Sequence, residues 1–314
     1  MNKKRIKFIL SLLFICISFG FFAFYLYRNY QDLPDIHWNV RTVSVSVLAV
    51  LIYTGNFLIA GTIWFILLKD YGAKIEWKET LRIISVSQFG KYLPGNIGQH
   101  VGRVALANEK EVPIIITLQT LFIESAILAI TGISISVLGF FFYNFQSLHD
   151  SRIVIIQLIL LALVALLLPK LFFFIINRFG KERLLKFTGG VQLRIPKFST
   201  LILVSILYLI TFFNIGIVLD LVAETVFEYP ESNIFLLTTA FSWSWILGYL
   251  TPGAPAGLGV REAIIVASLS TRYEPGIAIG LSVILRFITT IGDGAVFLIA
   301  SYYQKKSSEF KVKS

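Results

Sequence analysis

The chain contains one sequence pattern twice, as Tyr92-Leu93-Pro94-Gly95 followed by Arg103 and as Tyr249-Leu250-Thr251-Pro252-Gly253 followed by Arg261. In both copies an apolar segment ends in a Pro-Gly pair, small residues follow, and an arginine stands nine positions after the proline. Proline and glycine in the middle of a membrane helix remove backbone hydrogen bonds. Each copy therefore predicts a helix that is broken within a membrane and has a buried cation beside the break.

The composition places this pattern in a membrane. Hydrophobic residues make up 56% of the 314 residues, charged residues make up 15%, and the mean hydropathy is +0.77. Several apolar runs reach the roughly 20 residues that a helix needs to cross a bilayer. The net charge of +10 comes from basic residues at the ends of apolar runs and in short loops, so we do not expect nucleic acid as a partner. Cys16 is the only cysteine, which excludes a disulfide framework and a thiolate metal site.

The sequence predicts an all-α polytopic membrane protein with six full spans and two re-entrant helical hairpins. The apolar run over 6–27 is too long for a signal peptide and lacks a cleavage site, so we expect it to remain as a first helix. The hairpins are expected over 79–107 and 232–271, where the Pro-Gly pairs interrupt apolar sequence. The other full spans are expected over 42–68, 112–142, 153–177, 198–221 and 277–303.

The distribution of basic residues orients these spans through the positive-inside rule. With the N-terminus in the cytoplasm, the predicted cytoplasmic segments hold most of the Lys and Arg residues, six of them between Arg178 and Lys197. The predicted outer loops hold Arg28, Arg41, Arg152 and Arg272. We therefore expect a multi-pass protein of the cytoplasmic membrane with both termini in the cytoplasm.

Three predicted crossings separate the two hairpins, so one hairpin enters the membrane from each side. We expect a single membrane domain over 1–314, with inverted repeats over about 42–177 and 198–303 and the 6–27 helix in addition. The two hairpins enter from opposite sides only if neither of them crosses the membrane. Inverted repeats whose broken helices meet near the midplane are a recurrent transporter architecture.

Two motifs around the breaks are more specific. The first is Pro94-Gly95-Asn96-Ile97-Gly98, and the second is Gly257-Leu258-Gly259-Val260-Arg261-Glu262-Ala263. On these motifs the chain resembles the lysylphosphatidylglycerol synthase transmembrane family, a flippase-like membrane domain that some members fuse to a soluble aminoacyl-transferring domain. The resemblance extends over almost the whole chain and includes Arg286 in the last predicted span. It implies that the protein moves or presents an anionic lipid between leaflets.

The chain departs from the family pattern at two places. Members commonly have Glu-Arg in the helix after the first hairpin, whereas this chain has Glu124-Ser125 and lacks the arginine that would form an ion pair there. No soluble domain follows the last predicted span. We therefore expect a stand-alone member that is a transporter rather than an enzyme.

Charged side chains in the apolar segments are the candidate site residues, because a charge in the hydrocarbon region costs about 2.5–3.5 kcal/mol and is normally paired or hydrated. We expect Arg103 and Arg261 to hold a lipid phosphate by bidentate hydrogen bonds, helped by the half-helix N-termini after the breaks. Glu124, Arg286 and Asp293 are expected to set the polarity and the gate of the cavity. The predicted substrate-binding set is Arg103, Arg261, Pro94, Gly95, Gly98, His100, Pro252, Gly253, Gly259 and Glu262.

Structural interpretations stand beside these. The pairs Arg261 with Glu262 and Arg286 with Asp293 could be ion pairs that only lock helices together. Arg103 could instead snorkel to the cytoplasmic surface. His100 could be a satisfied polar residue at a helix junction, and Trp243 and Trp245 could pack against neighbours rather than face a lipid chain.

The function that the sequence favours is flipping or scrambling of an anionic lipid across the cytoplasmic membrane, without a cofactor or metal. The lipid would be phosphatidylglycerol-like or linked to a polyprenyl phosphate. One alternative is a non-transporting membrane subunit that assists a glycolipid- or phospholipid-synthesis enzyme. The other is a polytopic glycosyltransferase that uses a polyprenyl-phosphate sugar; it would need acidic residues in the first outer loop, where Asp32 and Asp35 do not form the expected dyad.

Overall fold

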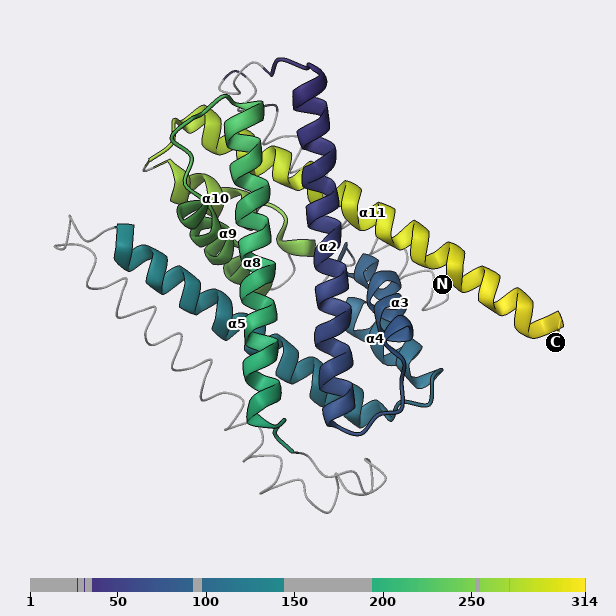
Figure 1. Cartoon of the computed structure of the whole chain (residues 1–314). Coiled ribbons are helices and arrows are strands. Elements are labelled where there is room, and N and C mark those ends of the chain that lie inside the picture. Colours follow the sequence, from purple (N-terminus) through teal and green to yellow (C-terminus); the bar gives the residue numbers. More distant parts are fainter. Residues whose placement is uncertain are drawn as a thin grey trace, which may run out of the picture.

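The computed structural model describes residues 27, 31, 36–92, 98–143, 194–251, 255–270 and 272–313 (Figure 1). Four of the described helices are long and apolar enough to cross a membrane. They are α2 (Val40–Asp70), α5 (Ile114–Tyr143), α8 (Phe198–Val226) and α11 (Pro275–Lys313). These helices confirm the apolar spans predicted over 42–68, 112–142, 198–221 and 277–303. The spans predicted over 6–27 and 153–177 lie outside the described residues.

Shorter helices occupy the two segments predicted as hairpins. The first segment consists of α3 (Trp77–Ser87), the 3-10 helix η2 (Gln88–Tyr92) and α4 (Gly98–Asn108). The second consists of α9 (Ile234–Leu250), the 3-10 helix η3 (Pro255–Gly257) and α10 (Val260–Leu269). Helix α3 packs against α4, and α9 packs against α10. The described chain thus runs twice through a long helix, a broken pair and a long helix, whereas Pro94, Gly95, Pro252 and Gly253 lie outside the described residues.

Local sequence fixes several helix ends. The side chain of Asn39 accepts a hydrogen bond from the backbone N–H of Thr42 at 2.9 Å and caps α2. Asn233 caps α9 in the same way, since it accepts from two backbone N–H groups of the first turn. Helix α2 ends before Gly72, which adopts a φ of 81° that an L side chain rarely takes.

The two broken pairs pack into different apolar clusters, with α9 and α10 in one and α3 and α4 in another. Helices α2 and α8 run side by side, and α5 and α11 cross them obliquely (Figure 1). The largest cluster of buried apolar side chains joins α8, α9, α10 and α11. Gly216 allows α8 to approach α9 closely, because an added Cβ would overlap the side chain of Thr238. The broken pair α9–α10 is therefore held inside the bundle.

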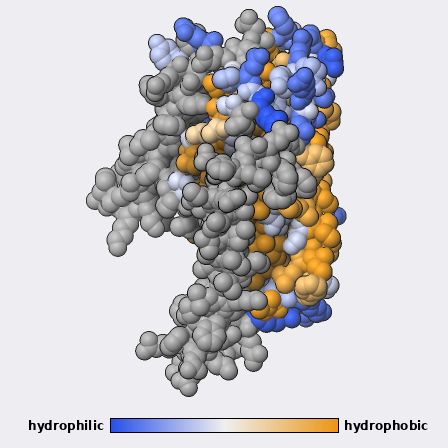
Figure 2. All heavy atoms as spheres, turned by 90° about the vertical axis from the view of Figure 1, so that its left-hand side faces the viewer, coloured by the Kyte–Doolittle hydropathy of each residue, from blue (hydrophilic) through white to orange (hydrophobic). Residues whose placement is uncertain are grey.

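The outside of the bundle is apolar. Val47, Leu51 and Leu58 of α2 are exposed, as are Ile206 and Leu209 of α8. Figure 2 shows hydrophobic residues in a band between hydrophilic residues at the two ends of the molecule. Exposure of this much apolar surface to water is unfavourable. In a bilayer the hydrocarbon chains of lipids would cover it.

Candidate functional site

A cavity of about 200 Å³ lies among the two broken helix pairs and the long helices. Residues from both halves of the chain line it, and η2 and η3 lie in contact beside it. It brings together six of the residues predicted from sequence, and Glu262 contacts one of them. These six are His100, Arg103, Glu124, Arg261, Arg286 and Asp293.

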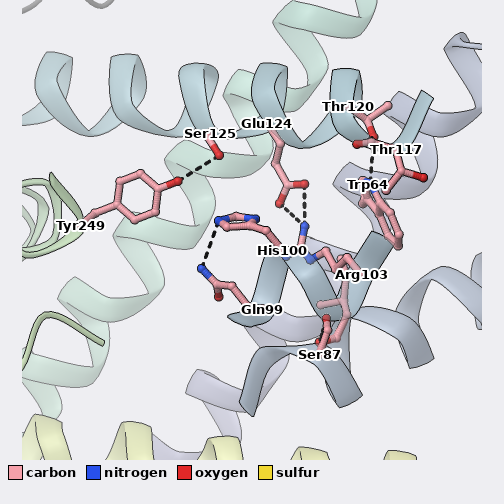
Figure 3. A network of polar contacts seen from close by, with 11 residues as sticks. Trp64, Ser87, Gln99, His100, Arg103, Thr117, Thr120, Glu124, Ser125 and Tyr249 are labelled. Carbon is pink, nitrogen blue, oxygen red and sulfur yellow. Dashed lines mark hydrogen bonds and ion pairs between the residues drawn. The ribbon is translucent and has the colours of Figure 1, made fainter. Parts of the chain in front are cut away.

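Arg103 of α4 and Glu124 of α5 form a buried ion pair (Figure 3). The Arg103 Nη1 atom donates to both carboxylate oxygens of Glu124, at 2.9 and 2.7 Å. The guanidinium also lies over the ring of Trp64, with its Cζ 5.5 Å from the ring centroid. Arg103 is 6% exposed, so it does not take the snorkelling position that was one interpretation of the sequence. Glu124 therefore pairs with an arginine of another helix, although no arginine is adjacent to it in the sequence.

Neutral polar side chains lie beside this pair (Figure 3). The Tyr249 hydroxyl donates to Ser125 Oγ at 3.0 Å and joins α9 to α5. Gln99 Nε2 lies 3.4 Å from His100 Nε2. His100 Nδ1 is buried without a hydrogen-bond partner, so His100 is not fully satisfied by the protein.

Asp293 of α11 anchors the first break. Its carboxylate lies 2.6 Å from Lys91 Nζ and accepts hydrogen bonds from the hydroxyls of Tyr53, at 2.7 Å, and Tyr92. The alternative in which Asp293 pairs with Arg286 is wrong. Seven residues of helix rise about 10 Å, so the two side chains face successive neighbours along α11. Sequence reasoning missed Lys91, although a lysine directly before a break in an apolar segment is the kind of intramembrane charge that points to a site.

Arg286 of α11 contacts the second break more loosely. Its Nη1 atom is 3.7 Å from Glu262 Oε1 and 3.5 Å from the carbonyl oxygen of Ala256. Glu262 Oε2 accepts a hydrogen bond of 2.6 Å from the backbone N–H of Gly259 and so caps α10. Ala256 is buried and has a φ of 50°, an uncommon conformation for a residue with a Cβ. The carboxylate of Glu262 is thus shared between a helix cap and Arg286, and the alternative interpretation in which it pairs with Arg261 is wrong.

Arg261 of α10 occupies a slot made by two glycines and an indole. A Cβ at Gly248 would lie 2.5 Å from Arg261 Cγ, and a Cβ at Gly257 would lie 2.8 Å from Arg261 Nε. The guanidinium lies over Trp245, with Cζ 5.4 Å from the ring centroid, and Trp245 also stacks on Tyr249 and makes a T-shaped ring contact with Phe212. Among the described residues Arg261 has no carboxylate partner, and its buried Nε has no hydrogen-bond partner. It is the cation that the described part of the cavity leaves unbalanced.

The remaining predicted residues have structural positions. Gly98 begins α4 and lies against Gly90 of η2, where an added Cβ would lie 2.5 Å from the Gly98 carbonyl carbon. Gly259 precedes α10 with a φ of 82°. Within the described ranges, no group of three or more His, Cys, Asp or Glu side chains could hold a metal ion. The site is therefore a set of hydrogen-bond donors and charges, with guanidinium groups as its distinctive chemistry.

Together these features define the class of the chain: a multi-pass α-helical membrane protein with a charged cavity between two broken helix pairs. Residues 8–296 match the sequence model of the family described as the lysylphosphatidylglycerol synthase TM region, and the chain belongs to this family. The resemblance drawn from the two motifs is thereby confirmed. No curated protein sequence matches the chain. Family membership relates the protein to flippase-like membrane proteins of lipid biosynthesis.

Proposed function

We propose that the protein moves an anionic lipid between the leaflets of the cytoplasmic membrane and binds the headgroup phosphate at Arg261. The observation that carries the proposal is the guanidinium of Arg261, which lines the cavity without a carboxylate partner among the described residues. An unbalanced charge away from bulk water is unfavourable. A phosphate relieves it and offers oxygens that a guanidinium binds in bidentate geometry.

The size of the cavity supports binding of a headgroup and not of a whole lipid. Sites for drug-sized ligands measure about 300–1,000 Å³, and this cavity measures about 200 Å³. The headgroup would enter the cavity while the acyl or isoprenoid chains stay in the bilayer. The apolar outer surface of α2 and α8 is suited to chains in that position.

The membrane arrangement belongs to the same proposal. We propose six full spans, with the α3–α4 and α9–α10 pairs as re-entrant hairpins of opposite direction and both termini in the cytoplasm. The repeated order of long helix, broken pair and long helix supports it. Contact between η2 and η3 supports it as well, because inverted hairpins would bring their breaks together near the midplane.

Arg103 and His100 would form a second station for the headgroup. Arg103 Nε and His100 Nδ1 are buried without hydrogen-bond partners. Both atoms are therefore free to form hydrogen bonds with a headgroup on that side of the cavity. A phosphate that reached Arg103 would compete with Glu124 for the guanidinium. A role for Pro94, Gly95, Pro252 and Gly253 in binding stays a prediction from the sequence, since they lie outside the described residues.

The test is dithionite quenching of fluorescent phosphatidylglycerol in liposomes that contain the purified protein. Wild type should expose the inner-leaflet label, and Arg261→Gln should slow this at least about tenfold, since hydrogen bonds to charged groups contribute about 1.5–3 kcal/mol. Arg41→Gln is the matched control, because Arg41 is exposed at the start of α2. Wild type no faster than empty liposomes, or Arg261→Gln as fast as wild type with a normal gel-filtration profile, would reject the proposal.

A further inference from the structure

The charges around the cavity do not cancel. The described cations of the site are Lys91, Arg103, Arg261 and Arg286, and its described carboxylates are Glu124, Glu262 and Asp293. With His100 neutral, four positive and three negative charges leave a balance of one positive charge. The residues at the two breaks, 93–97 and 252–254, contain no ionisable side chain and leave this balance unchanged.

The excess positive charge is located at the second break. Glu124 is occupied by Arg103, and Asp293 is occupied by Lys91 and two tyrosine hydroxyls. Arg261 and Arg286 both lie against η3: Arg286 Nη1 is 3.5 Å from the Ala256 carbonyl, and Arg261 Nε lies beside Gly257. The one carboxylate near these two arginines is that of Glu262, which lies 3.7 Å from Arg286.

We infer that the cavity selects a headgroup with a single negative charge, a phosphodiester, and that Arg261 and Arg286 clamp this phosphate together. One negative charge brings the balance to zero, whereas a doubly charged phosphate leaves an uncompensated negative charge beside three carboxylates. A phosphodiester carries one charge near neutral pH, whereas a phosphomonoester carries about −1.5 to −2. The inference rests on the proposed translocation and narrows its substrate class. It favours phosphodiester lipids, including glycosyl phosphates of polyprenols, over phosphatidic acid, polyprenyl monophosphates and diphosphates.

The test compares phosphatidylglycerol with phosphatidic acid, both carrying the same labelled acyl chain, in the dithionite assay at a pH well above the second phosphate pKa of about 6. Wild type should move phosphatidylglycerol about tenfold faster than phosphatidic acid. Glu262→Gln raises the balance of the cavity by one positive charge and keeps an acceptor oxygen for the Gly259 N–H. This variant should equalise the two rates or reverse their order.

Glu124→Gln is a second variant that changes the same balance; because it also breaks the ion pair with Arg103, its two lipid rates are compared with each other and not with the rates of wild type. Glu109→Gln is the matched control, because Glu109 is exposed after α4. An unchanged ratio of the two rates in both cavity variants, or equal rates in wild type, overturns the charge selection alone. If wild type moves neither lipid, translocation and charge selection are both wrong.

Discussion

The ion pair between Arg103 and Glu124 predicts a large loss of stability when one partner is removed. The two side chains are 7% and 9% exposed, and one guanidinium nitrogen serves both carboxylate oxygens. Replacing Glu124 by leucine would leave the positive charge buried over Trp64 with no anion to balance it. Breaking a buried pair in this way costs about 3–5 kcal/mol.

The same structure predicts that replacing both partners restores most of this loss. In Arg103→Met/Glu124→Leu no charge is left unpaired, and apolar replacement of a buried pair is often neutral or stabilising. With about 2–4 °C per kcal/mol for a chain of a few hundred residues, the single variant should melt about 6–20 °C below wild type. The double variant should melt close to wild type.

Thermal unfolding in detergent, followed by scanning fluorimetry and gel filtration, measures the difference. Arg41→Met is the control for loss of an exposed arginine, and it should leave the melting temperature unchanged. A Glu124→Leu variant that melts with wild type, or a double variant that melts as low as the worse single variant, would show that the pair is not a buried electrostatic unit.

Three further changes test single contacts. Gly248→Ala should slow lipid movement severalfold, because its Cβ would lie 2.5 Å from Arg261 Cγ and the arginine would have to shift; alanine favours a helix by about 1 kcal/mol, which offsets part of this clash, so its melting temperature should fall less than that of Gly90→Ala. Gly90→Ala should reduce the yield of folded protein, because its Cβ would lie 2.5 Å from backbone of α4 that cannot shift cheaply. Asp293→Asn should lower the free energy of unfolding by about 3–5 kcal/mol, and hence the melting temperature by about 6–20 °C, because Lys91 loses its anion.

Gly55→Ala is the control for both glycine variants, since a Cβ at Gly55 would meet nothing within 4 Å. It should match wild type in yield and in lipid movement. If Gly248→Ala moves lipid at the wild-type rate, the position of the Arg261 side chain is not important for transport. If Gly90→Ala behaves like Gly55→Ala, the close contact between Gly90 and α4 is not required for folding.

Local signals in the sequence predicted the long helices of the described residues. A span is encoded by an uninterrupted apolar run, as over 198–221, and proline and glycine predict that a helix is interrupted. Both signals act within a few residues and need no knowledge of packing. The bounds of α8, Phe198–Val226, extend beyond the predicted span, and Val222, Ala223 and Val226 continue its buried face.

The partners of the buried charges could not be predicted in the same way. Arg286 and Asp293 share a helix at a suggestive spacing, yet each is paired with a residue of a different broken helix. Which carboxylate meets which cation depends on how helices pack, and that is a property of residues far apart in sequence. The slot around Arg261 has the same origin, since Gly248 and Gly257 acquire their meaning only when α9 and α10 lie side by side.

The central claim is that a lipid headgroup occupies the cavity at Arg261, and photo-crosslinking tests it most directly. A phosphatidylglycerol analogue with a diazirine on its headgroup would be incorporated into liposomes with the protein, irradiated, and its attachment sites mapped by mass spectrometry. The account predicts attachment to cavity residues such as Trp245 and Tyr249, with loss of these sites in Arg261→Gln and their retention in Arg41→Gln. Attachment confined to the lipid-facing surface of α2 and α8, unchanged in Arg261→Gln, would contradict it.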